Sequence, residues 1–280
     1  MKQATQTNAE TEPRPLGSGS VLVCKLLLLA LAASICSGQS TLGPPQVGYV
    51  RDEGGFYRAV WGIAGNFHLG EVVLYDVLGA AFSGRFGLLK TEDQVLVVDA
   101  LASVVGRVEA GPGRAWFAFA GDGSPALALV PSSGSFFGWR DGRMERVPFR
   151  LEPGEEVLAL GSAVEDRYRL AVRREGSCWM RTVSFPGGLV VDEMLQDDCG
   201  EPILLRHDGA LISVRDRDVV LRSAEGVELH ARLPDRLTRL EQMGADWIFA
   251  VTASGLPLAL RLEPDRIAWF YLPQQVEEKR

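Results

Sequence analysis

The chain has 280 residues, a formal net charge of −7 and 46% hydrophobic residues. This apolar fraction is typical of a globular protein that buries a core, and it excludes a largely disordered chain. Nucleic-acid binding needs a cationic surface that displaces counterions from phosphates. The acidic balance therefore excludes a nucleic acid from the expected partners.

The amino-terminal region predicts an export signal. Residues 21–35 read VLVCKLLLLALAASI, and the uninterrupted apolar stretch after Lys25 spans about ten residues, the length of a signal-peptide core rather than of a bilayer span. Small residues follow at 36–38. We expect cleavage after Gly38, so that residues 1–38 are a signal peptide and 39–46 a linker. The expected location is periplasmic or extracellular.

Three alternatives accompany this signal. The polar region before the apolar core is 20 residues long, which a misassigned start would explain if translation begins near Val21. An uncleaved segment would instead anchor the protein, and only then is a membrane an expected partner. Lipid attachment at Cys36 is disfavoured by the bulky Ile35 before it.

Cleavage of the signal peptide would leave two of the four cysteines in the mature chain, Cys178 and Cys199. An oxidising compartment allows such a pair to form a disulfide. The segment between them reads as two strands around the turn 186–188 (Pro-Gly-Gly), and this hairpin would bring the cysteines together. Closing a loop of about 20 residues would stabilise the fold by roughly 3 kcal/mol. Two unpaired buried thiols are the alternative.

The remaining sequence predicts many short strands. Runs of four to seven residues rich in Val, Leu, Phe and Trp alternate with turn signals, without sustained helical periodicity. Clear turn signals are Asp141-Gly142, Asp208-Gly209 and Glu225-Gly226. Gly supplies the positive φ that tight hairpins require.

These strands recur in units. Similar apolar segments begin near Ala80, Ala115, Glu156, Pro202 and Arg239. Their spacing averages about 40 residues, the period of a four-stranded propeller blade.

We therefore predict an all-β fold, a β-propeller of about six four-stranded blades over residues 47–273, with a frayed tail at 274–280. The segment Val47–Trp61 adds a hairpin that turns at Gly54-Gly55, expected to belong to a further blade completed by strands from elsewhere in the chain. Five or seven blades are alternative counts. The alternative architectures are a two-sheet sandwich, or two small β-domains that divide near Pro153-Gly154.

Three segments carry a resemblance: GYVRD at 48–52, GIAGNFHLG at 62–70 and FSGRFGLLKT at 82–91. The chain resembles a group of uncharacterised exported β-propeller-like proteins of soil bacteria. The Trp-Asp and Gly-His signatures of the best-known propeller repeats are absent. The resemblance implies a fold and a location, and it transfers no catalytic residue to this sequence.

The sequence shows no motif for common chemistries. The three histidines, His68, His207 and His230, form no HExxH or other close pair, so we predict no metal site. The carboxylates at 216–218 and 197–198 lack an EF-hand pattern. No GxSxG sequence is present. We therefore predict no catalytic residue and no cofactor.

The six tryptophans are Trp61, Trp116, Trp139, Trp179, Trp247 and Trp269. Five lie inside strand-like runs, roughly one per repeat, which favours packing between blades over a ligand-stacking role.

The favoured function is a non-enzymatic scaffold. We expect an exported propeller whose loops or central channel bind a protein, peptide or glycan. One alternative is a carbohydrate-active enzyme with carboxylates gathered from several blades. The other is a membrane-anchored component of an envelope assembly.

Overall fold

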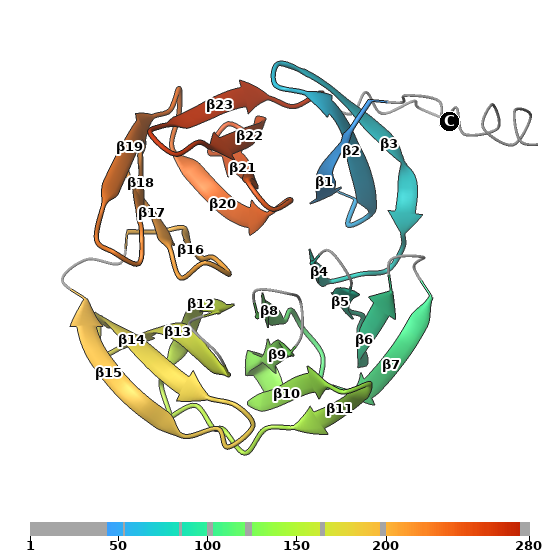
Figure 1. Cartoon of the computed structure of the whole chain (residues 1–280), viewed down its shortest axis with the longest axis vertical. Helices are drawn as coiled ribbons and strands as arrows, with labels where there is room; N and C mark the ends of the chain where they lie inside the picture. The colour runs from blue at the N-terminus through green and yellow to red at the C-terminus, as the bar shows by residue number, and fades with distance from the viewer. Residues whose placement is uncertain are drawn as a thin grey trace, which may run out of the picture. The chain divides into compact units, whose positions relative to one another are not determined.

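The structure is a computed structural model, and it describes residues 44–52, 54–83, 86–99, 103–120, 125–162, 166–196 and 200–274. These residues form a β-propeller of six blades around a common centre (Figure 1). The only helical element in the described ranges is one 3₁₀ turn, η1 (Pro131–Ser133). No helix there is long and apolar enough to cross a membrane.

The blades follow one another along the chain. Blades 1 to 3 consist of β1 (Gln46–Arg51), β2 (Tyr57–Ile63), β3 (Asn66–Leu74); β4 (Gly79–Phe82), β5 (Phe86–Lys90), β6 (Gln94–Asp99), β7 (Val104–Glu109); and β8 (Trp116–Phe119), β9 (Ala126–Val130), β10 (Ser135–Arg140), β11 (Arg143–Arg146). Blades 4 to 6 consist of β12 (Glu156–Ser162), β13 (Arg167–Arg174), β14 (Ser177–Ser184), β15 (Val190–Gln196); β16 (Ile203–Leu205), β17 (Leu211–Arg215), β18 (Asp218–Arg222), β19 (Glu228–Arg232); and β20 (Leu237–Gln242), β21 (Trp247–Thr252), β22 (Pro257–Leu262), β23 (Ile267–Tyr271).

Within each blade the strands pair antiparallel in sequence order. The first strand of each blade lies at the centre and the last lies at the rim (Figure 1). Short hairpin turns make this order possible. Asp141 and Gly142, for example, both adopt positive φ between β10 and β11, as the sequence of that turn predicts.

The propeller prediction is confirmed. The five predicted units begin within a few residues of β4, β8, β12, β16 and β20. The two alternative architectures are wrong. Pro153-Gly154 lies in the short link between β11 and β12 and therefore joins two blades of one ring.

Blade 1 differs from the expectation of a blade shared between distant parts of the chain. Its three described strands, β1 to β3, are consecutive, whereas the other five blades have four strands each. No described strand from the carboxyl end joins this sheet. Side-chain packing, together with one backbone hydrogen bond, therefore closes the described ring between blades 6 and 1.

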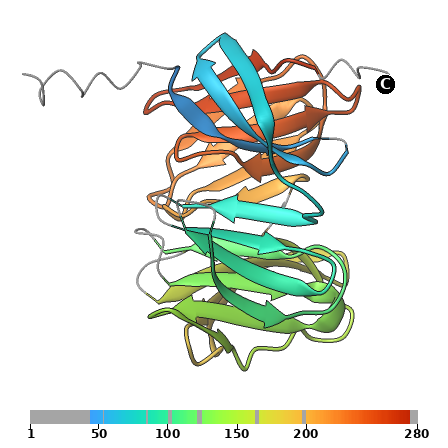
Figure 2. The same cartoon turned by 90° about the vertical axis from the view of Figure 1, so that its right-hand side faces the viewer.

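The core is divided among the contacts between neighbouring blades. Six clusters of buried apolar side chains are present in the described residues, and each joins one blade to the next. Figure 2 shows the ring from the side, with neighbouring sheets face to face. A single antiparallel sheet has two faces, so covering both requires a neighbour on each side.

The contact between blades 6 and 1 completes the ring. The Phe67 ring on β3 lies 5.3 Å from Trp247 and 6.1 Å from Phe270, both of blade 6. The backbone N–H of Tyr49 donates to the Met243 carbonyl at 3.0 Å. A Cβ on Gly48 would lie 1.8 Å from that carbonyl oxygen, so this close approach of backbones requires glycine.

We predict that Phe67→Ala lowers the free energy of unfolding by about 3–5 kcal/mol, because it removes a buried ring from the closing contact. Amide exchange should accelerate first in blades 1 and 6. The matched control is Phe136→Ala in the cluster between blades 3 and 4, where the faster exchange should appear instead. Even acceleration around the whole ring in both variants would contradict closure by this contact.

The hairpin expected between the two cysteines of the mature chain is present, but the disulfide stays a prediction. Cys178 is buried on β14, opposite Gln196 at the end of β15. Cys199, three positions farther along the chain, lies outside the described residues, as does the whole predicted signal peptide.

We predict that protein recovered from an oxidising compartment contains a peptide linked through Cys178 and Cys199, detectable by non-reducing mass spectrometry. Cys199→Ser should lower the free energy of unfolding by roughly 3 kcal/mol. Reductant should bring the parent protein to the level of this variant and leave the variant unchanged. Two alkylatable thiols in unreduced protein would contradict the pairing.

Candidate functional site

The centre of the ring is a cavity of about 1430 Å³. The first strands of all six blades line it, namely β1, β4, β8, β12, β16 and β20. A site here would therefore combine side chains that lie far apart in the sequence. Cavities of a few hundred to a thousand Å³ hold most small ligands, so this space suffices for a peptide segment.

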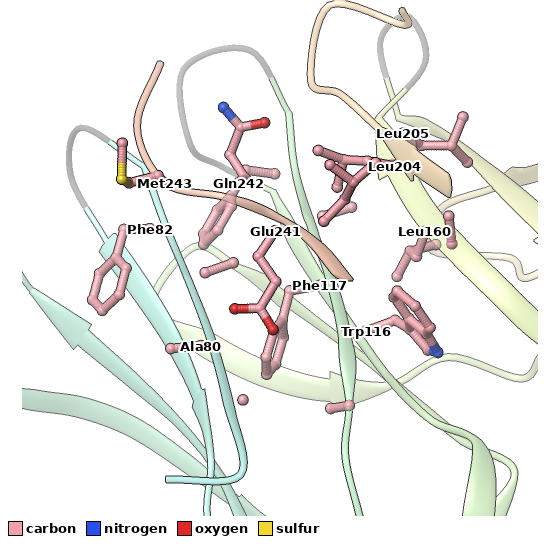
Figure 3. A pocket seen from close by; sticks show the side chains of 18 of the residues that line it. Ala80, Phe82, Trp116, Phe117, Leu160, Leu204, Leu205, Glu241, Gln242 and Met243 are labelled. Carbon is pink, nitrogen blue, oxygen red and sulfur yellow. The ribbon is translucent and has the colours of Figure 1, made fainter. Parts of the chain in front are cut away.

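Most of the wall is apolar. The strands β4, β8 and β16 have the sequences GAAF, WFAF and ILL. Figure 3 shows Phe82, Trp116, Phe117 and Leu204 around the cavity, with Ala80 between larger side chains. The small residues leave the space open, while the aromatic rings supply flat apolar surface.

One strand of the wall is different. On β20, Arg239 and Glu241 lie two positions apart and form a bidentate ion pair. Arg239 Nε donates to Glu241 Oε1 at 2.7 Å, and its terminal nitrogen donates to Oε2 at 2.7 Å. Both side chains are partly exposed, at 22% and 32%. They place donors and acceptors in an otherwise apolar wall.

The position of Glu241 is fixed by its neighbours. In Figure 3 its side chain extends from β20 into the cavity, on the side of Ala80 and Phe117. Burial raises the pKa of the Tyr57 phenol, and the nearby Glu241 carboxylate raises this pKa further. Tyr57 belongs to blade 1, so the charge on blade 6 acts across the boundary between two blades.

Three further carboxylates line the cavity, those of Asp99, Glu156 and Glu201. Glu156 at the start of β12 and Glu201 before β16 both form ion pairs with Arg173. A glycoside hydrolase needs one protonated carboxylic acid beside a second carboxylate. Here Glu156, Glu201 and Glu241 are each engaged by an arginine, an arrangement that suits binding and positioning more than proton donation. Asp99 at the end of β6 accepts from the backbone N–H of Ser103 at 2.9 Å.

The candidate residues from the sequence do not converge. His68 lies on β3, His207 in the turn after β16 and His230 on β19, and only His207 lines the cavity. No group of three His, Cys, Asp or Glu side chains in the described ranges is arranged to hold a metal ion. Of the six tryptophans, all lie on strands, and Trp116 alone lines the cavity.

No sequence motif marked Arg239 and Glu241 as residues of the cavity wall. A signal was present: the first strand of each repeat carries no charge in its interior except LTRLEQ, which becomes β20. Because the first strand of a propeller blade faces the centre, this comparison identifies Arg239 and Glu241.

Buried charges outside the cavity are satisfied locally. The Arg181 guanidinium pairs with Glu155 at 2.5 Å and Glu193 at 2.6 Å, all in or beside blade 4. Lys90, fully buried on β5, donates to the backbone carbonyls of Thr91 and Glu92. These contacts stabilise individual blades and suggest no ligand.

Comparison with known proteins shows a likeness in fold. No protein-family model matches the chain, and no curated protein matches it. Solved structures do. The WD40 repeats of RRP9 share 12% identity over 80% of this chain and 77% of that one, with a TM-score of 0.52. PorZ, a surface component of the type-IX secretion system of Porphyromonas gingivalis, shares 13% identity over 81% of this chain and 31% of that one, with a TM-score of 0.48.

Virginiamycin B lyase from Staphylococcus aureus is a third similar structure, with 11% identity over 86% of this chain and 87% of that one and a TM-score of 0.45. At such identities the likeness shows the propeller fold alone.

We predict that alkaline conditions reveal the environment of Tyr57. Its folded pKa lies above the ordinary value of 10.0. The unfolded chain therefore loses this proton first, and the free energy of unfolding falls by up to about 1.4 kcal/mol per pH unit above about pH 10. Tyr57→Phe should lack this part of the decline in urea titrations.

The control is Tyr271→Phe, because Tyr271 is 52% exposed and should contribute nothing to the slope. If Tyr57→Phe and the parent protein decline in parallel above pH 10, the buried position of the phenol beside Glu241 is contradicted.

Proposed function

We propose that this propeller is an exported, non-enzymatic binding protein whose central cavity holds an apolar peptide segment of a protein partner. Export rests on the apolar segment at 21–35 and its small flanking residues. Binding rests on the cavity.

The observation that best supports binding in the cavity is that β20 carries two charged side chains in its interior, whereas the other five inner strands carry none there. An apolar wall favours apolar side chains through burial of their surface. The ion pair of Arg239 and Glu241 adds fixed donors and acceptors on one side. Binding sites commonly combine a mostly apolar lining with a few polar groups that set orientation.

This lining favours a peptide over a glycan. A sugar carries a hydroxyl on most of its carbons, and each hydroxyl that leaves water needs a new hydrogen-bond partner. The strands GAAF, WFAF and ILL offer only the indole N–H of Trp116 for this purpose. A peptide requires partners mainly for its amides, and the edge of an unpaired inner strand or the ion pair can provide them.

The test is selection of a phage-displayed random heptapeptide library on the full chain purified from an exporting host. We expect enrichment of apolar peptides that bind with micromolar to millimolar affinity in calorimetry. Leu204→Trp, which fills the cavity from β16, should abolish their binding. Leu189→Trp is the matched control, because Leu189 is 67% exposed outside the cavity.

Two results would overturn the proposal. One is a set of enriched peptides that bind the parent protein and Leu204→Trp equally well. The other is a failure to enrich any peptide while maltotetraose binds to the parent protein and not to Leu204→Trp, which would favour the glycan alternative. Circular dichroism of both variants checks that the fold is retained.

A further inference from the structure

The cavity has a side extension between blades 1 and 2. At this boundary it is lined by residues of second and third strands: Tyr57 on β2, Leu74 on β3, Phe86 on β5 and Val98 on β6. Among the described residues, second and third strands line the cavity nowhere else. We call this extension, together with Tyr49 and Phe82 at its inner end, the slot.

The slot lies at the contact between blades 1 and 2. Four apolar side chains are fully buried at this contact and five more are partly buried against them, whereas seven to thirteen are fully buried at each of the other five contacts in the described chain. Ala80 on β4 packs against this cluster, and the side chains of Phe82 and Val98 lie directly beside Gly87 on β5.

The lining of the slot suits an aromatic group. Its inner end is aromatic, because the Tyr49 and Phe82 rings lie 4.3 Å apart and Tyr57 meets Phe82 edge-on at 6.3 Å.

Polar groups stand where the slot joins the main cavity. Glu241 extends into the cavity on the side of Ala80, which packs against the cluster shared by blades 1 and 2 (Figure 3). With Arg239 it presents a carboxylate and guanidinium side by side. A peptide amide, which has one donor and one acceptor, complements such a pair, whereas an isolated hydrocarbon does not.

We propose that the slot is a specificity pocket for one aromatic side chain of a peptide whose backbone lies in the cavity beside Arg239 and Glu241. This inference rests on the proposed function and names the side chain that it selects. Contacts between aromatic rings stabilise a complex beyond the burial of their apolar surface, so the slot should favour Phe or Tyr over Leu at one peptide position.

The experiment uses the most enriched heptapeptide and variants of it with Phe, Leu or Ala at the aromatic position, measured by calorimetry. We expect the parent protein to bind the Phe peptide about tenfold more tightly than the Ala peptide. Leu74→Trp, which fills the slot, should remove this preference, so that the Phe and Ala peptides bind the variant with equal affinity.

Leu74→Ala, which enlarges the slot, should instead improve binding of a Trp peptide relative to Phe. N-acetyl-phenylalaninamide, followed by saturation-transfer NMR, tests whether the ring binds without the rest of the peptide, and Leu74→Trp should abolish its signal. A free aromatic compound such as phenol should compete weakly, because it lacks the amides.

The outcomes separate the two proposals. If enriched peptides lose binding in Leu204→Trp but show no aromatic preference, or keep that preference in Leu74→Trp, the slot proposal is wrong and the cavity proposal stands. If Leu204→Trp has no effect on any peptide, the cavity proposal is wrong and the slot proposal falls with it.

Discussion

The structure depends on one constraint: an antiparallel sheet with two apolar faces must be covered on both sides. A ring of sheets meets this constraint because every blade covers two neighbours, and no apolar face is left exposed to water. The contact between blades 6 and 1 is therefore as necessary as any other. Phe67, Trp247 and Phe270 pack across it, and the backbone hydrogen bond from Tyr49 to Met243 adds to this contact, so each closing side chain contributes to the stability of the whole ring.

The same constraint explains how much of the fold could be predicted. Turn residues such as Asp141 and Gly142 predict where strands end, because they are local signals. A repeat of about 40 residues predicts the blades. Blade 1 could not be predicted completely. Its three strands lack the fourth that the repeat demands, and whether a distant segment completes a sheet depends on long-range pairing, which local patterns do not encode.

The cavity residues could not be predicted from the sequence for a related reason. Trp116 and Glu241 are 125 positions apart in the sequence and share a wall only because two first strands face the same centre. Spacing rules for motifs assume that functional residues lie on one element. A propeller instead gathers one strand from each repeat, so comparing equivalent strands between repeats is the informative reading, and it singles out β20.

The charges on β20 are not explained by stability. Arg239 and Glu241 are partly exposed to the cavity, and exposed ion pairs contribute little, typically less than about 1 kcal/mol. The other inner strands show that apolar and small residues suffice to build this wall. A pair of charges in a wall that the fold can build without them is better explained by a ligand that requires both an apolar surface and a polar anchor.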